Sequence, residues 1–232
     1  RLRCDWSSDV CSSDLTNSII PSGGLLNVPY YYDGCTCSYP LPTAMSLVAM
    51  PQSHEQWSSW GESEIEPAKI QRIGINFGAP GDRMTREGTL WLDFPSIGGP
   101  SPIVNSEVTT STHYRYSHSV WMRSPEPYPW VSASMAVGLE RFVIKDLKPG
   151  RYLVRLYFAE PEALGQKHRL QDIKLQGRNV IVDFDVVDEA DGVMKGVIKE
   201  FASIEVKNDL TLELSAANGK TIISGIELIR RD

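Results

Sequence analysis

The sequence contains no long apolar segment and no excess of basic residues. None of its stretches stays apolar for the roughly 18 residues that a membrane-spanning helix needs, so no such helix is predicted. The 232 residues include 23 lysines and arginines against 29 aspartates and glutamates, a net charge of -6. This mildly acidic balance gives no support for binding to nucleic acid or to an anionic membrane. An initial Met and an apolar segment after the first basic residues are also missing, so we expect an internal part of a longer chain.

Patterns that would hold a metal or support catalysis are also scarce. The cysteines stand at positions 4, 11, 35 and 37, a spacing that fits no Cys-x-x-Cys zinc pattern. No Gly-x-Ser-x-Gly motif precedes a helical pattern. We therefore expect no cofactor, no metal site and no catalytic activity.

One acidic run, residues 183–191, needs a separate interpretation. Asp183 and Asp185 would share a strand face, where they could bind Ca²⁺ or form the carboxylate pair of a glycosidase. No pattern nearby supplies a substrate cleft. A solvated strand end and turn is therefore the favoured interpretation.

Residues 1–15 do not look like part of a fold. They repeat Ser-Ser-Asp, have no hydrophobic period, and over about eleven residues resemble a translated sequencing adapter. We treat this segment as an artefactual or disordered arm and exclude it, with Cys4 and Cys11, from the functional argument.

Residues 16–50 carry the signs of a few short strands. Apolar pairs on either side of Ser22-Gly23-Gly24 predict a hairpin, and residues 46–50 predict one more strand. The motifs Thr-Asn-Ser-Ile-Ile-Pro, Gly-Leu-Leu-Asn-Val-Pro and Cys-Thr-Cys-Ser-Tyr-Pro resemble the closing blade of propellers related to pyrroloquinoline-quinone-type repeat proteins. The resemblance implies an upstream β-propeller in the same polypeptide as a partner.

The state of Cys35 and Cys37 stays open. On a strand their Cα atoms would lie about 6.6 Å apart, so a bond between them would be strained. Two small buried thiols are the simpler interpretation. The propeller resemblance adds a third, in which one of them paired with an upstream cysteine just before Thr16, where Leu15 now stands.

Residues 51–67 are polar and acidic and are predicted to form a linker. Trp57 and Trp60 stand three positions apart in it. We expect these indoles to dock on a neighbouring domain.

Residues 68–232 are predicted to form an all-β jelly-roll sandwich. About ten strands follow one another, with Gly, Pro, Asn and Asp turns between them and no sustained helical period. The expected strands are residues 70–77, 89–94, 114–122, 141–144, 151–159, 173–175, 180–186, 201–206, 210–214 and 222–229. In residues 151–159 the alternation places Tyr152, Val154, Leu156 and Phe158 on one buried face. By pattern, residues 201–206 pair with residues 210–214.

Four motifs in this part of the chain identify a family resemblance. They are Gly74-Ile75-Asn76-Phe77-Gly78, the strand from Gly150 that ends in Phe158-Ala159-Glu160, Asp183-Phe184-Asp185-Val186 and Gly225-Ile226-Glu227-Leu228. In this order they resemble the malectin and malectin-like domains. The resemblance implies a lectin-like jelly roll that recognises carbohydrate through loops at one end of the sandwich.

The chain departs from malectin at three binding positions. The aromatic pair after Phe158-Ala159-Glu160 is replaced by Pro161-Glu162-Ala163, a tyrosine is replaced by Val131, and an acidic residue is replaced by Asn218. Sugar binding would therefore use other residues and would be weak.

Stacking on a sugar ring needs aromatic faces, and its hydroxyls need polar partners. The candidate aromatic residues are Tyr114, Tyr116 and Trp130, and the candidate polar partners are Asp82 and Asn218. Core packing is the competing interpretation for the tyrosines. It is the favoured one for Trp121, whose neighbours are apolar.

The function predicted from these features is a non-catalytic carbohydrate-binding module of a larger propeller protein, secreted or periplasmic. The alternative is a structural or interaction module that docks on the propeller and has lost its sugar site.

Overall fold

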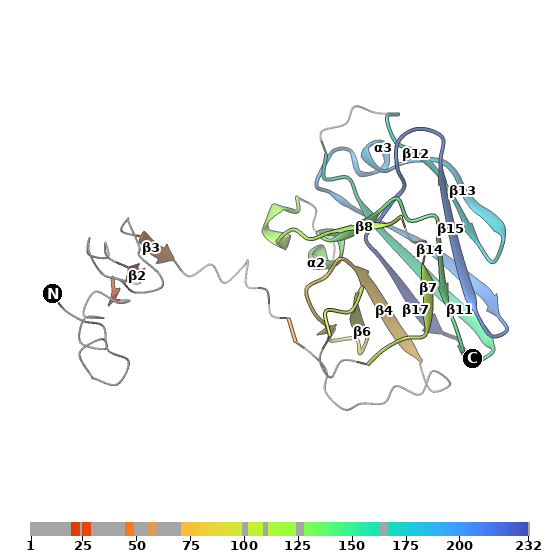
Figure 1. The fold of residues 1–232 in the computed structure, drawn as a ribbon, viewed down its shortest axis with the longest axis horizontal. Coiled ribbons are helices and arrows are strands. Elements are labelled where there is room, and N and C mark those ends of the chain that lie inside the picture. The colour runs from red at the N-terminus through yellow and green to blue at the C-terminus, as the bar shows by residue number, and fades with distance from the viewer. Residues whose placement is uncertain are drawn as a thin grey trace. The chain divides into compact units, whose positions relative to one another are not determined.

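The computed structural model describes residues 20–23, 25–28, 45–48, 55, 57–58, 71–98, 102–108, 111–123, 128–162 and 167–231. These belong to two compact units, Arg1–His54 and Glu55–Asp232 (Figure 1). The predicted adapter segment, Trp60 and the two cysteines at 35 and 37 lie outside the described residues.

The described part of the first unit is a small antiparallel sheet. Strands β1 (Ile20–Ser22), β2 (Leu25–Val28) and β3 (Met45–Val48) follow one another in the order β1-β2-β3. Gly23 has a φ of 59°, which a glycine adopts without strain in a tight turn. The predicted hairpin and the extra strand are both confirmed.

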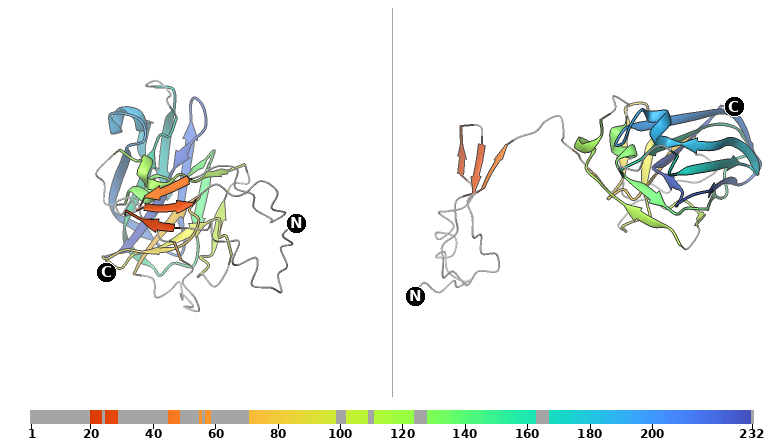
Figure 2. Two further views of the ribbon diagram at one scale, coloured as in Figure 1. Left: turned by 90° about the vertical axis from the view of Figure 1, so that its left-hand side faces the viewer. Right: turned by 90° about the horizontal axis from the view of Figure 1, so that it is seen from above.

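The second unit is a sandwich built on a six-stranded and a five-stranded sheet, with a third, three-stranded sheet (Figures 1 and 2). The six-stranded sheet has the order β14 (Gly196–Val206), β11 (Gly150–Ala159), β17 (Gly225–Arg230), β4 (Arg72–Phe77), β6 (Leu90–Phe94), β5 (Arg83–Met84). The five-stranded sheet has the order β13 (Arg178–Asp185), β12 (Leu170–Leu175), β15 (Leu210–Ala216), β10 (Arg141–Ile144), β7 (Ser106–Val108). The small sheet has the order β16 (Ile222–Ile223), β9 (Met135–Val137), β8 (His113–Arg115). The described residues also form the short helices η4 (Ser119–Trp121), α2 (Pro129–Ser132) and α3 (Val186–Ala190). The predicted all-β sandwich is confirmed.

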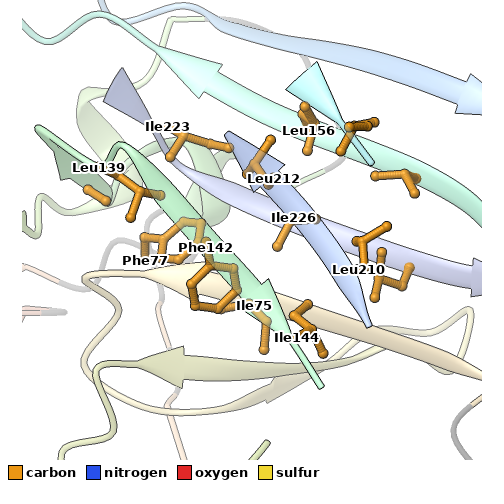
Figure 3. Close-up of a cluster of buried hydrophobic side chains, with 14 of the residues drawn as sticks. Ile75, Phe77, Leu139, Phe142, Ile144, Leu156, Leu210, Leu212, Ile223 and Ile226 are labelled. Atoms are coloured by element: carbon orange, nitrogen blue, oxygen red, sulfur yellow. The ribbon is translucent and has the colours of Figure 1, made fainter. Parts of the chain in front are cut away.

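The main core lies between the two large sheets. The inward side chains of β11 are fully buried, as the alternation predicted: Tyr152, Val154, Leu156 and Phe158. Leu156 and Ile226 from the six-stranded sheet lie near Phe142 and Leu212 from the five-stranded sheet (Figure 3). Burial of these apolar faces is the main force that holds the sheets together.

The pairing predicted between residues 201–206 and 210–214 is wrong. β14 pairs with β11, whereas β15 pairs with β10 and β12. The turn between them crosses from one sheet to the other, and Val206 and Leu210 at its two ends are both buried in the core. The Gln176 amide fastens this crossing by donating hydrogen bonds to the carbonyl oxygens of Glu205 and Asp209.

The strand predicted for residues 114–122 is also mostly wrong. Only β8 is a strand, and the chain then turns into η4. The side chain of His118 accepts a hydrogen bond from the backbone N–H of Val120, which favours a helical turn over an extended strand.

Candidate ligand-binding site

On the outer face of the six-stranded sheet, aromatic and apolar side chains pack directly on two glycines. A Cβ on Gly74 would lie 2.2 Å from Cδ2 of Trp91, and one on Gly225 would lie 2.7 Å from Cγ1 of Val131. Only glycine therefore leaves room for the Trp91 indole and for helix α2 to approach the sheet this closely. Packing on the outer face thus explains the glycines Gly74 and Gly225 in two of the motifs that resemble malectin.

Around Trp91 the aromatic rings form a second apolar cluster, separate from the main core. The ring of Trp91 lies 5.1 Å from that of Tyr157 and 5.8 Å from that of Trp130, and both contacts are edge-on. Tyr128 lies 5.6 Å from Trp130. Edge-on contacts of this kind stabilise a cluster beyond the area that they bury.

Helix α2 carries Trp130 into this cluster. The Asn76 side chain donates a hydrogen bond to the carbonyl oxygen of Trp130 at 3.5 Å. The Arg83 guanidinium lies over the indole, 4.8 Å from its centroid. Because Trp130 is only 7% exposed, its ring contributes to packing and offers little surface to a ligand.

The residues Glu55, Trp57 and Ser58, here called the strap, cover this cluster. The ring of Trp57 packs edge-on against Trp130 at 5.8 Å and against Tyr116 at 6.2 Å. Ser58 and Asp82 exchange two backbone hydrogen bonds, of 3.1 and 2.7 Å. The docking expected for Trp57 is therefore observed.

Glu55 fastens the other end of the strap. Its Oε1 accepts a hydrogen bond from the Ser119 backbone N–H at 2.6 Å, and its Oε2 accepts one from the Tyr116 hydroxyl at 2.6 Å. Burial raises the pKa of the Glu55 carboxyl, whereas these hydrogen bonds and the nearby His118 lower it by a larger amount. The net pKa therefore lies below its ordinary value. Glu55 is thus held as a carboxylate at the start of η4.

Asp82 is fully buried and shapes the neighbouring loop. Its Oδ1 accepts a hydrogen bond from the Asp93 backbone N–H at 3.1 Å, and Asp93 in turn accepts one from the Ile97 N–H at 2.9 Å. Burial, together with the Asp82 carboxyl, raises the pKa of Asp93. In this structure Asp82 does not present its carboxyl to solvent.

A buried carboxylate also lies beneath the aromatic cluster. Glu227 accepts hydrogen bonds from Thr89 at 2.6 Å and Tyr157 at 3.1 Å, and it forms ion pairs with Arg72 at 3.2 Å and Arg155 at 3.3 Å. Burial and the adjacent carboxylate raise the pKa of Tyr157 well above its ordinary value. Since both oxygens of Glu227 are occupied, the network has a structural role.

A chain of charges runs across the loops that follow β8 and β11. Arg115 pairs with Glu162 at 2.7 Å, and Glu162 also lies 3.6 Å from Arg169. Arg169 donates to the buried Glu160 at 2.7 Å. Burial raises the pKa of Glu160, although the ion pair with Arg169 and the Glu162 N–H oppose this effect.

The loop between β15 and β16 joins the same network. Arg169 donates a hydrogen bond to the carbonyl oxygen of Lys220. In that loop Gly219 has a φ of 74°, and Asn218 beside it is exposed. The charge network thus places Asn218 on a loop that is tied to the end of β11.

The exposed aromatic residues lie on the segment after β8. Tyr114 is half-buried against Phe94, with ring centroids 5.9 Å apart. Tyr116 is 44% exposed and Trp121 is 65% exposed. The prediction that Trp121 belongs to the core is therefore wrong, because its apolar neighbours lie on an exposed turn rather than on a buried strand.

The structure brings some of the predicted site residues together and not others. Tyr116, Trp130 and Asp82 all contact the strap, although two of them are buried. Tyr114 packs on the core, and Asn218 belongs to the charged loops. Of the five, only Tyr116 and Asn218 are exposed.

Several residues of this region were missed by the sequence argument. Arg115, Glu162 and Arg169 carried no motif that set them apart from other surface charges. Glu160 stood in one of the family-like motifs, and its position directly after the apolar residues Leu156-Tyr157-Phe158-Ala159 is the one signal that could have suggested a buried carboxyl. Glu55 was noted only as part of an acidic linker.

The acidic run at residues 183–191 has structural roles. Asp185 is the N-cap of α3 and accepts hydrogen bonds from the first backbone N–H groups of the helix. Glu189 pairs with Lys199 at 2.7 Å, and Asp191 pairs with Lys195 at 3.4 Å. These contacts agree with a strand end and turn.

Comparison with known proteins finds a family model that is similar to the second half of the sandwich. Residues 141–229 match the family model described as Malectin domain, which covers the chain from β10 almost to the end of β17. A probable leucine-rich repeat receptor-like serine/threonine-protein kinase of Arabidopsis thaliana is 36% identical over 83 residues, which are 32% of this chain and 8% of the kinase.

Solved structures share the fold at low sequence identity. The plant receptor-like kinase ANX2 superposes with a TM-score of 0.56 and 13% identity, over 69% of this chain and 48% of that one. The ANXUR2 extracellular domain from Arabidopsis thaliana gives 0.54 and 14%, over 70% and 49%. The β-glucuronidase of Bacteroides uniformis gives 0.55 and 15%, over 69% and 18%. The chain thus spans less than half the length of these proteins, and the likeness shows the sandwich fold. Among the described residues, no helix is long and apolar enough to cross a membrane.

Proposed function

We propose that the unit from Glu55 to Asp232 is a non-catalytic carbohydrate-binding module. The observation that carries the proposal is the match of residues 141–229 to the Malectin domain model, on a chain that folds as a sandwich. In the larger polypeptide the module would follow a β-propeller, in a secreted or periplasmic protein.

The state of the carboxylates supports a binding role rather than a catalytic one. A glycosidase needs two carboxyl groups that are free to act on a sugar. Here Glu227 is fully buried under four polar contacts, Glu160 is paired with Arg169, and Asp185 caps a helix. Each of these three carboxylates is occupied by the protein itself.

The predicted residues divide into contact and support roles in this proposal. Tyr116 and Asn218 are exposed and able to touch a ligand. Trp130 and Asp82 would act by holding the strap, and Tyr114 by holding β8 on the core. With few exposed partners, the Kd should be near millimolar.

A second candidate is a structural module that docks on the propeller. The observation that favours it is the coverage of Trp130, whose ring is occupied by Trp57 on one side and by Arg83 on another. In that case the aromatic cluster serves only stability.

Multivalent display separates the two candidates. The biotinylated full chain, assembled on tetrameric streptavidin, is applied to an array of gluco- and galacto-oligosaccharides, since avidity makes weak binding visible. The proposal expects retention on a subset of glycans. The docking module expects a different result. No glycan would retain the chain, and a longer chain that includes the propeller would have a higher free energy of unfolding than this chain.

A further inference from the structure

Trp121 combines high exposure with a firmly held backbone. The Trp121 backbone N–H donates to the His118 carbonyl at 3.1 Å, and the Met122 N–H donates to the Ser119 carbonyl at 2.9 Å. The next residue, Arg123, donates its N–H to the Met194 carbonyl at 2.7 Å. The turn is therefore fixed at its C-terminal end to the loop before β14.

The other end of the turn is fixed by the strap. Glu55 accepts hydrogen bonds from the backbone of Ser119 and from the Tyr116 hydroxyl, both at 2.6 Å. Contacts between the two elements place η4 beside α2. A turn fixed in this way presents an indole whose backbone loses little freedom when a ligand binds.

The exposed apolar surface on this turn is larger than a single side chain. Val120 is 49% exposed and Tyr116 is 44% exposed, within a few residues of Trp121. Single exposed apolar residues, such as Ile103 and Val182, are ordinary on protein surfaces. A fixed turn that exposes two aromatic rings and a valine is more typical of a contact surface.

We propose that Trp121 is the stacking platform on which the carbohydrate ligand rests its apolar ring face. This inference rests on the proposed function and adds the residue that supplies the main stacking surface. Trp121 occupies the role that the aromatic pair after Glu160 would have filled. Arg123, two residues after Trp121, is exposed and supplies a donor for sugar hydroxyls. Glu55 is a positioning residue because it holds the start of the turn.

The test follows the indole N–H signals of the full chain, uniformly labelled with ¹⁵N, during titration with gluco- and galacto-oligosaccharides. The sequence has 6 tryptophans, so the indole region of the spectrum is sparse, and Trp121→Phe assigns the relevant signal. The expected result is a sugar-dependent shift of the Trp121 indole that is larger than those of the buried Trp91 and Trp130.

Affinity measurements on two variants complete the test. Trp121→Ala should weaken binding at least about fivefold, because one aromatic stack and its buried area are lost. Val182→Ala removes exposed apolar surface on β13, where Val182 is 57% exposed, and should leave affinity unchanged.

The outcomes separate this inference from the proposed function. Unchanged affinity in Trp121→Ala, while the full chain still binds sugar, overturns the inference and leaves the binding module intact. Absence of any sugar-dependent shift overturns both. Concentration-dependent self-association that Trp121→Ala abolishes, without sugar binding, would assign the turn to a second copy of the chain instead.

Discussion

At the scale of single residues, Phe158 marks the centre of the sandwich. Its ring is fully buried and lies 5.0 Å from that of Phe184, which reaches it from the opposite sheet. Phe158→Ala should reduce the free energy of unfolding by about 3–5 kcal/mol, because it removes buried apolar surface and leaves a cavity. Chemical denaturation measures this loss. The exposed Val182→Ala serves as the control, and a loss below about 1 kcal/mol for Phe158→Ala would contradict the assigned strand faces.

The packing of Trp91 on the outer face can be tested in the same way by a substitution at Gly74. Gly74→Ala places a Cβ 2.2 Å from the Trp91 indole, so we expect a loss of about 1–3 kcal/mol or more from overpacking. Trp91→Leu should be destabilising by itself, but it makes room for the added methyl group. In the double variant the effect of Gly74→Ala should therefore nearly vanish, and simple additivity in denaturation would mean that the indole is not the obstacle.

The sequence predicted residues well where alternation decided their environment. Tyr152, Val154 and Leu156 are buried as expected, because a strand has only two faces. Trp121 and Trp130 were predicted less well. Exposure on a turn or burial under another segment depends on tertiary contacts that local composition does not contain.

At the scale of elements, the strap depends on one ionised group. The Glu55 carboxyl has a pKa below its ordinary value of 4.5, so its contribution to stability is present above that pH and is lost as pH falls through the lower pKa of the folded state. Its charged neighbours are His118 and Arg83. Acidification should therefore release the strap.

Amide hydrogen exchange at Asp82 reports this release, because the Asp82 N–H donates to the Ser58 carbonyl at 2.7 Å. After correction for intrinsic rates, protection of this amide should fall as the pH drops below 4.5. Glu55→Gln should reduce the protection already at neutral pH and remove most of the pH dependence. Equal pH dependence in both proteins would contradict the assignment of the effect to Glu55. Asp93 does not account for it either, because its raised pKa favours the fold as the pH falls.

Regular elements were predicted better than irregular ones. The β12–β13 hairpin forms around Gln176-Gly177, both with positive φ, between the strands predicted at residues 173–175 and 180–186. Helix α2 and the turn η4 are too short to produce a periodic pattern, and side-chain and backbone contacts fix them. In the sequence, the segment between β14 and β15 resembles a hairpin turn. A turn sequence does not indicate whether the two strands that it joins belong to the same sheet.

At the scale of the whole molecule, the fold class and the positions of most strands along the chain could be predicted from the sequence, and the candidate site only in part. Jelly-roll strands leave a strong local pattern, whereas loops that meet at one end come from distant positions. Arg115 and Arg169 illustrate this, since they join through Glu162 although they lie far apart in the chain.

The central claim is that these loops and the η4 turn bind carbohydrate. Backbone amide shifts of the full chain, mapped by NMR during titration with gluco- and galacto-oligosaccharides, test it most directly. We expect saturable shifts, with a Kd near millimolar, confined to residues 115–123 and the β15–β16 loop around Asn218. Shifts spread over the sandwich, or none at tens of millimolar sugar, would contradict it.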